Sequence, residues 1–259
     1  MIEEALSNLR LINELEVLIP IALLAVILVA ISKSGFGGAL GSLGLPVMVL
    51  VFPPKLAIAI LLPLYLITDV FVAFTWRKFP VFKILKLMVL GGLIGQILGW
   101  LCFEYLDDSY ILILIGLLAL STSIRYFKDI FIKDYFVKKT KKILELSYTR
   151  AIGWCGFSGF SSFVALTGGI PAQIFLLPLG LERQLFVGTM SFYFLIINLA
   201  KLPFFFNLEV FSHTSILLSF IVLPILPLGI YLGKLLNKKL SDKLFYHISH
   251  FALFLCDNT

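Results

Sequence analysis

Two glycine-rich stretches, set inside apolar sequence, hold the residue types best suited to binding a ligand. The first covers residues 35–46 and the second covers residues 156–171. Glycine lets a chain turn sharply and approach a ligand closely. Where a helix is interrupted, the free N–H groups at the start of the next helix favour an anion. A matched pair of interrupted hydrophobic segments is therefore typical of the binding site of a transporter.

Neutral hydroxyl and amide groups in and beside both stretches add hydrogen-bond donors. This combination suits a small oxyanion better than a metal cation, which prefers carboxylates. We therefore expect substrate contacts, and no catalytic residue, metal or cofactor, at Lys33, Gly35, Phe36, Gly37, Gly38, Ser161, Ser162, Thr167, Gly168, Gly169 and Gln173. Two alternatives stay open: the glycines only allow close helix crossing, and the Gln173 amide contacts free backbone instead of substrate.

Charged and amide side chains within apolar segments are candidates for coupling or gating, because a charge in a spanning helix is costly and usually faces a cavity. Asp69 is the only acid in its apolar run, and it either carries a proton or pairs with Lys33 or Arg77. Asn198 takes the matching place in the second half of the chain. Lys201 lies near the end of its helix, where the alternative is that its amine reaches to the membrane surface.

Composition places almost the whole chain in a membrane. Of 259 residues, 60% are hydrophobic and only 14% are charged, and the mean hydropathy is +1.03. Several apolar runs reach the length of about 20 residues that a helix needs to cross hydrocarbon. No Ser–His dyad, HExxH or paired carboxylates occur in these runs, so we do not expect an enzyme. The acids ahead of the first run have the wrong charge for a cleaved signal peptide.

Lysine and arginine in the loops predict the orientation. The basic connector at 125–150 should lie in the cytoplasm against anionic lipid, and we expect no nucleic acid as a partner. The basic turns near 77–86 and 237–243 should also be cytoplasmic, whereas the acidic turn at 104–108 should face outside. Both termini are then expected outside the cell inner membrane.

These loop assignments require the stretch at 144–180 to enter the membrane and return to the cytoplasm, and the stretch at 15–53 to do the same from outside. The predicted fold is an all-α polytopic membrane protein of two inverted-topology repeats. Each repeat would be a broken or re-entrant helix hairpin plus three transmembrane helices. We expect a single transporter domain over residues 1–259, with repeat 1 at about 15–127, a connector at about 128–143 and repeat 2 at about 144–257.

Glycine also recurs with a period of four at Gly91, Gly95 and Gly99. Glycine at this spacing lets helix backbones approach closely in lipid. The pattern predicts either static packing inside the bundle or a sliding or homodimer face. His247 and His250 lie three residues apart on the last expected helix, and helix packing is favoured over a metal site because no further ligand is near in sequence.

The chain resembles the TauE/SafE family of sulfite and organosulfur-anion exporters over residues from about 15 to the end. The resemblance rests on Lys33–Gly38, the Phe52–Pro54 turn, Gly159–Phe163, Thr167–Gly169, Gln173–Pro178, Phe186–Thr189 and Asn198–Pro203. Leu166 and Ile170 depart from the family, which often has His and Pro there. The resemblance implies a secondary carrier of small sulfur-containing anions in the bacterial inner membrane.

We therefore expect an exporter of small sulfur-containing anions, such as sulfite or organosulfonates, working by alternating access. An anion channel, or an uptake carrier for another small anion, stays open as an alternative. A membrane assembly protein without transport activity is a third hypothesis.

Overall fold

The computed structural model describes residues 2–38, 40–103, 105–113, 116–117 and 146–239, with side chains from residue 17 onward apart from Leu40. In these ranges every regular element is a helix and no strand occurs, which confirms the predicted all-helical fold. The connector expected at about 128–143, the helix expected beyond residue 240, and His247 and His250 lie outside the described residues.

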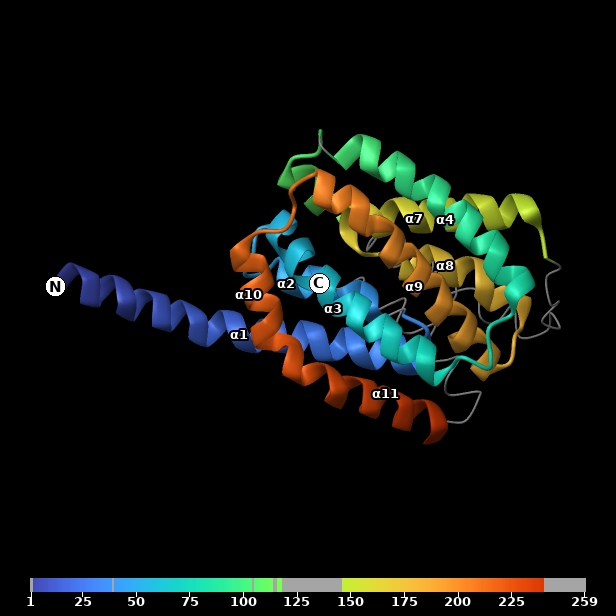
Figure 1. The fold of residues 1–259 in the computed structure, drawn as a ribbon, viewed down its shortest axis with the longest axis horizontal. Helices are drawn as coiled ribbons and strands as arrows, with labels where there is room; N and C mark the ends of the chain where they lie inside the picture. Colours follow the sequence, from blue (N-terminus) through green and yellow to red (C-terminus); the bar gives the residue numbers. More distant parts are fainter. Residues whose placement is uncertain (1, 39, 104, 114–115, 118–145, 240–259) are drawn as a thin grey trace, which may run out of the picture.

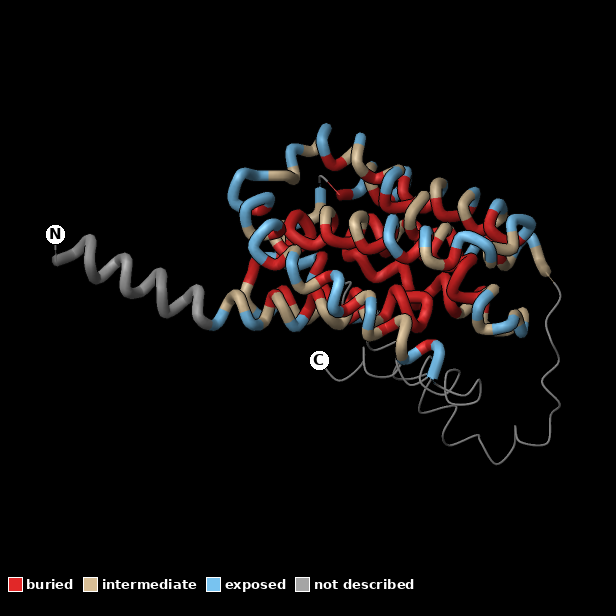
Figure 2. Tube along the Cα trace, turned by 60° about the horizontal axis from the view of Figure 1, so that its bottom comes forward, coloured by how far each residue is buried: buried red, intermediate tan, exposed pale blue. Residues whose placement is uncertain are grey.

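Five helical segments are long and apolar enough to cross a membrane. They are the apolar part of α1 (Ile2–Phe36) from residue 17, α3 (Pro54–Thr75), α4 (Phe82–Phe103), α9 (Arg183–Asn207) and the continuous stretch His213–Lys239. The outer surface of the bundle carries large apolar side chains, among them Phe74 on α3 and Leu101 on α4. In Figure 2 the buried residues gather inside the bundle and the exposed ones lie on its outer faces. This arrangement fits a protein surrounded by lipid.

Proline modifies the last described span. The continuous stretch His213–Lys239 is divided into α10 (His213–Val222), a 3₁₀ turn η3 (Leu223–Ile225) and α11 (Leu226–Lys239). The turn contains Pro224, which has no N–H to give to the preceding helical turn, and this is the physical reason for the interruption. Pro203 has a milder effect, since α9 continues through it to Asn207.

Both glycine-rich stretches contain a helix end followed by short return elements. After α1, residues 37–38 lead into the 3₁₀ helix η1 (Leu40–Leu43) and α2 (Gly44–Met48). After α7 (Tyr148–Ala165), residues 166–168 lead into α8 (Gly169–Leu176) and the 3₁₀ helix η2 (Leu177–Leu179). The second interruption is therefore shorter than expected from residues 156–171. Gly156 and Gly159 lie inside α7 and serve its packing.

Glycine contacts join each broken helix to a second helix. A Cβ atom on Gly95 of α4 would collide with the backbone of Gly156 in α7, and one on Gly159 would collide with the backbone of Gly92. On the opposite side, a Cβ atom on Gly233 of α11 would collide with Ser34 and Ile31 of α1. The period-four glycines of α4 thus pack against α7, as the static-packing alternative predicted.

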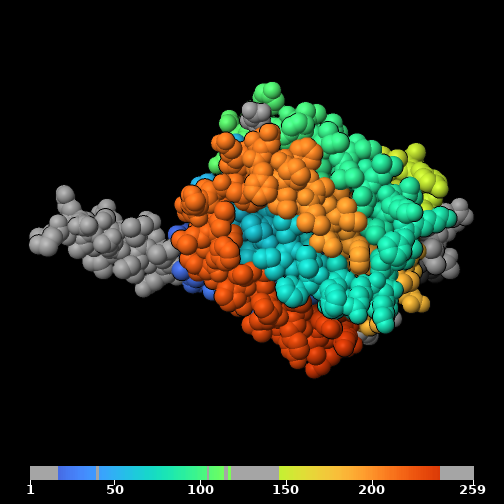
Figure 3. Space-filling view, in the orientation of Figure 1, coloured from blue at the N-terminus to red at the C-terminus, as the bar shows by residue number. Residues whose placement is uncertain are grey.

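Corresponding helices of the two halves run in opposite directions. In Figure 1, α1 runs from left to right and α7 from right to left, and α3 and α9 are opposed in the same way. Figure 3 shows α9 lying between α3 and α4 on one face, with α10 and α11 along its edge. The ends of α1 and α7 are therefore brought toward each other inside the bundle, beside α3 and α9.

Candidate functional site

The buried charges of the described residues all lie at one place. They are Lys33, Asp69 and Lys201, which are 5%, 1% and 0% exposed. The Lys33 amine on α1 forms a salt bridge with Asp69 Oδ1 on α3 at 2.6 Å. Of the two partners expected for Asp69, Lys33 is the one that binds it, whereas the Arg77 guanidinium lies over the ring of Phe74. Removing charges from water is costly, so their gathering at one point indicates a polar site inside the bundle.

Hydrogen bonds extend this ion pair into a chain across four helices. Asn198 on α9 donates to Asp69 Oδ2 at 2.6 Å. The Lys201 amine donates to Asn198 Oδ1 at 2.8 Å and to Ser162 Oγ on α7, also at 2.8 Å. Lys201 is therefore turned into the protein and does not extend to the membrane surface. The two amines of the chain share a single carboxylate.

A small cavity of about 10 Å³ lies between the two helix breaks and against this chain. Both breaks and both central helices contribute to its wall, which consists of Lys33, Gly38, Gly41, Tyr65, Ser162, Leu166, Gly169, Phe194 and Asn198. All of these residues are buried. The cavity is about the size of one water molecule, so the protein is closed around it.

Two aromatic rings complete the surroundings of Lys33. Its amine lies 4.3 Å from the ring centroid of Tyr65 on α3 and 5.4 Å from that of Phe194 on α9. A desolvated cation over an aromatic face gains about 2 kcal/mol. The Tyr65 hydroxyl donates to the carbonyl of Gly41 at 2.8 Å and so holds the first return segment against α3.

Left-handed backbone ends both broken helices. Gly37 and Gly38 have φ of +66° and +90°, and Leu166 has φ of +52°. In each half an N–H after the helix donates to a serine carbonyl six residues earlier: Gly38 to Ser32 at 3.1 Å, and Thr167 to Ser161 at 3.3 Å. The glycines are suited to this conformation, whereas a leucine there is strained. The chain therefore leaves both helices by the same geometry.

Side chains from three other elements bind the last carbonyls of α1. Trp76, at the end of α3, donates to Ser34 O at 3.1 Å. Asn237 of α11 donates to Gly35 O at 2.6 Å, and Gln173 of α8 donates to Phe36 O at 3.0 Å. These carbonyls have no partner within their own helix, and a buried one would be costly if left alone. Gln173 therefore contacts free backbone, the second of its two expected roles.

The predicted site residues separate into two groups. Lys33, Gly38, Ser162, Gly169 and Asn198 line the cavity, and Asp69 and Lys201 bind those lining residues from behind. The others shape the breaks. Among them, Ser161 lies in the last turns of α7, Thr167 and Gly168 lie within the second break, and Gly35, Phe36, Gly37 and Gln173 surround the end of α1.

Gly169 illustrates how closely the breaks approach each other. A Cβ atom there would collide with the carbonyl of Gly38, so the start of α8 meets the end of the first break backbone to backbone. Gly169 is also the first residue of α8, where N–H groups have no intrahelical partner. The cavity wall thus includes the first residue of α8 on one side and Lys33 on the other.

The site residues predicted from the sequence do not include Tyr65 and Phe194 of the cavity wall, whereas Gly41 falls in the first glycine-rich stretch at 35–46. A signal for the two aromatic residues was present, since Tyr65 is four residues before Asp69 and Phe194 is four before Asn198. Residues four apart share a helix face. Leu166, noted only as a departure from the family pattern, also lines the cavity. Ile170, the other departure, packs with Leu43 and Ile174 outside it.

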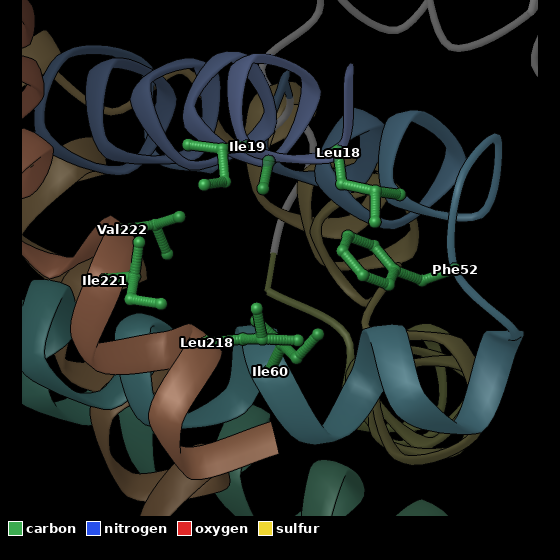
Figure 4. A pocket seen from close by; sticks show the side chains of 8 residues that line it. Leu18, Ile19, Phe52, Ile60, Leu218, Ile221 and Val222 are labelled. Carbon is green, nitrogen blue, oxygen red and sulfur yellow. The ribbon is translucent and has the colours of Figure 1, made fainter. Parts of the chain in front are cut away.

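A second small cavity has a different character. It lies near the start of the apolar part of α1, against α3 and α10, and its wall is made of aliphatic side chains and Phe52 (Figure 4). It offers no polar group to a charged ligand. Among the described residues, no group of three or more His, Cys, Asp or Glu side chains lies together in either place or elsewhere.

Comparison with known protein families gives a match that covers most of the chain. A family model described as Sulfite exporter TauE/SafE matches residues 22–256. No curated protein and no solved structure matches the chain. The matched range includes both helix breaks, the ion pair and all residues of the cavity wall.

Proposed function

The chain belongs to the sulfite exporter TauE/SafE family, and we propose that it is a secondary carrier that exports a small sulfur-containing anion across the cell inner membrane. Membership of this family and five apolar spans make it a multi-pass membrane transporter. The proposal goes further by placing the substrate in the cavity between the two breaks, with access alternating between the two sides of the membrane.

The observation that carries the proposal is the imbalance of buried charge at this cavity. Two amines and one carboxylate leave one positive charge when both amines are protonated. An unbalanced charge far from water is costly unless a partner neutralises it. An anion between the breaks supplies that partner. It would contact Lys33 and Ser162 directly and receive N–H groups from the start of α8.

The closed cavity is consistent with an occluded form of the carrier. An anion as large as sulfite does not fit a space of about 10 Å³, so loading requires the walls to part. The opposed directions of α1 and α7 support an inverted repeat, in which opening on either side uses equivalent motions. The glycine contacts join α1 to α11 and α4 to α7, so we infer that these helix pairs, rather than the sequence halves, move as units.

Opening must break the polar contacts that join the two sides of the site. Two of these contacts are the bond from Asn198 to Asp69 and the bond from Gln173 to the Phe36 carbonyl. A bound anion compensates for their loss, because Lys33 and Asn198 then have a new partner. Substrate binding and opening are coupled in this way without a cofactor.

Transport by proteoliposomes tests the proposal. Vesicles containing the full-length protein and loaded with sulfite or methanesulfonate should show counterflow of the labelled anion. Gly37→Leu and Ser162→Leu should abolish it while the proteins still insert, because both substitutions fill or distort the site. Gly153→Ala is the matched control, since a Cβ atom there meets nothing within 4 Å. Undiminished transport by both leucine variants would disprove the proposal.

The same vesicles separate the alternatives. Counterflow is a property of carriers, so anion flux without counterflow would favour a channel. The direction of the driving gradient distinguishes export from uptake. No flux of any anion would leave the assembly role.

A further inference from the structure

Three buried ionisable groups lie at the cavity, the Lys33 and Lys201 amines and the Asp69 carboxylate. We propose that the site selects its substrate by charge, binding monovalent anions in preference to divalent ones, and that Asp69 is the residue that sets this limit. This inference rests on the proposed function and adds a selection rule to it. It concerns the number of charges on the substrate and not which atoms the substrate contains.

The contacts of the three charged groups define the balance. Asp69 is fully engaged, with one carboxylate oxygen bound by Lys33 and the other by Asn198. Lys201 has only neutral partners, the Asn198 carbonyl oxygen and the Ser162 hydroxyl. The described residues contribute no other buried Asp, Glu, Lys, Arg or His here. When both amines are protonated, one positive charge is left, and a single negative charge neutralises it.

Burial makes this balance decisive. Lys201 and Asp69 are 0% and 1% exposed, so water screens them little. In such a site each unbalanced charge interacts strongly over several ångströms. A monovalent anion leaves the loaded site neutral. A divalent anion leaves it with one negative charge, buried and close to the Asp69 carboxylate.

Asp69 acts through its charge and not through contact with the ligand. It does not line the cavity, whereas its partners Lys33 and Asn198 both do. Replacing it by asparagine keeps the size of the side chain and removes one negative charge, which raises the surplus to two. Lys201→Met has the opposite effect and lowers the surplus to zero while keeping a long unbranched side chain.

The test compares methanesulfonate with sulfate, which have similar tetrahedral shapes and differ by one charge. Dissociation constants for both anions are measured by thermal shift on the purified full-length protein, and their ratio is the readout. The wild-type protein should prefer methanesulfonate. Asp69→Asn should move the ratio at least tenfold toward sulfate, and Lys201→Met should move it at least tenfold away from sulfate.

Ser42→Ala is the control, because Ser42 is buried beside Gly169, carries no charge and has a hydroxyl without a hydrogen-bond partner among the described residues. Its ratio should match that of the wild-type protein. Gel filtration confirms that each variant is folded, and if Asp69→Asn is not, Lys201→Met decides the question alone.

The outcomes distinguish this inference from the proposed function. If both anions bind but the charge variants keep the wild-type ratio within twofold, charge selection is wrong and the carrier proposal stands. If the wild-type protein binds neither these anions nor sulfite, both are wrong. Opposite shifts in the two charge variants would establish that Asp69 limits the charge of the substrate.

Discussion

The two broken-helix units use the same backbone plan with different side chains. Asp69 and Asn198 are separated by 129 residues and hydrogen-bond to each other. The same interval relates three further pairs at the site, listed with the first-half member first: Lys33 and Ser162, Tyr65 and Phe194, Gly37 and Leu166. In two of these pairs the first half has a charged side chain where the second half has a neutral polar one. In the aromatic pair, the first half has a tyrosine hydroxyl that the second half lacks.

This difference shows that the fold and the chemistry of the site have separate requirements. Both halves need a helix that stops in left-handed backbone and a second helix beside it. Only one half needs the ion pair. The second half instead has Lys201, whose counterpart by the same interval is the apolar Val72. Each half therefore has one buried amine, Lys33 on α1 and Lys201 on α9. Only the first half also has a buried carboxylate, Asp69.

The strongest test of the comparison is to remove the amine from the first half. Lys33→Met leaves Asp69 buried without its cation, and breaking a buried ion pair in this way costs about 3–5 kcal/mol. We expect a large loss of thermal stability in detergent. Ser162→Ala, the counterpart change, should cost about 1.5–3 kcal/mol, because it removes one hydrogen bond from an amine.

The double variant with Lys33→Met and Asp69→Asn should regain most of the stability, since no buried carboxylate is then left without its cation, but should not regain transport. Equal losses for Lys33→Met and Ser162→Ala would mean that the halves contribute alike, and the comparison would fail.

The glycine contacts are the place where the two halves should behave alike. Gly95→Ala would collide with Gly156, and a Cβ atom at Gly229 would lie 2.6 Å from Ala30 Cβ. Each change overpacks a helix pair, and we expect a loss of about 1–3 kcal/mol in the free energy of unfolding. Gly153→Ala serves as the control and should not destabilise, because open space surrounds it. A loss confined to one half would show that the scaffold is not duplicated.

The conformation of the breaks gives a smaller expected difference. Gly37→Ala places a side chain at φ +66° and brings its Cβ atom to 2.8 Å from Phe186, so we expect a loss of about 1–2 kcal/mol. At position 166 a side chain already lies in left-handed backbone, so Leu166→Ala adds no backbone strain. Any loss of stability in this variant should come from lost packing alone. Thermal unfolding of Leu166→Asn, which tolerates this backbone better, measures that part directly; no gain over Leu166→Ala would contradict the assignment of strain.

The aromatic pair should give the smallest effect. Tyr65→Phe copies the second half into the first and removes only the hydrogen bond to the Gly41 carbonyl, at a cost of about 1 kcal/mol. The ring over Lys33 is kept. Transport should therefore continue, and a complete loss of transport would give the Tyr65 hydroxyl a role in the site that this hydrogen bond does not explain.

The sequence indicated the membrane fold, the two breaks and the residues that meet between them. Loop charges and long apolar runs are strong signals because lipid tolerates few alternatives. The pairing of Asp69 with Lys33 is one of the alternatives that their opposite charges predict. The sequence alone also places Asn198 at the position that matches Asp69 in the second half.

Other parts of the site were beyond sequence reasoning for physical reasons. Glycine in lipid serves both to end helices and to let them pack closely, so Gly156 and Gly159 looked like part of a break. Lys201 near a helix end had two reasonable directions, and only packing decides that it turns toward Ser162. The contact of Gln173 with the end of α1 joins residues 137 positions apart, which no local pattern predicts.

The three side chains that bind the end of α1 have a consequence for the order in which the chain is completed. Trp76, Gln173 and Asn237 follow their carbonyl partners by 42, 137 and 202 residues. A ribosome that has delivered the first half has supplied only the first of these partners. The end of α1, although made early, therefore reaches its final form only when α8 and α11 have been synthesised and have docked. Until then the Gly35 and Phe36 carbonyls lack the Asn237 and Gln173 side chains that bind them in the finished protein.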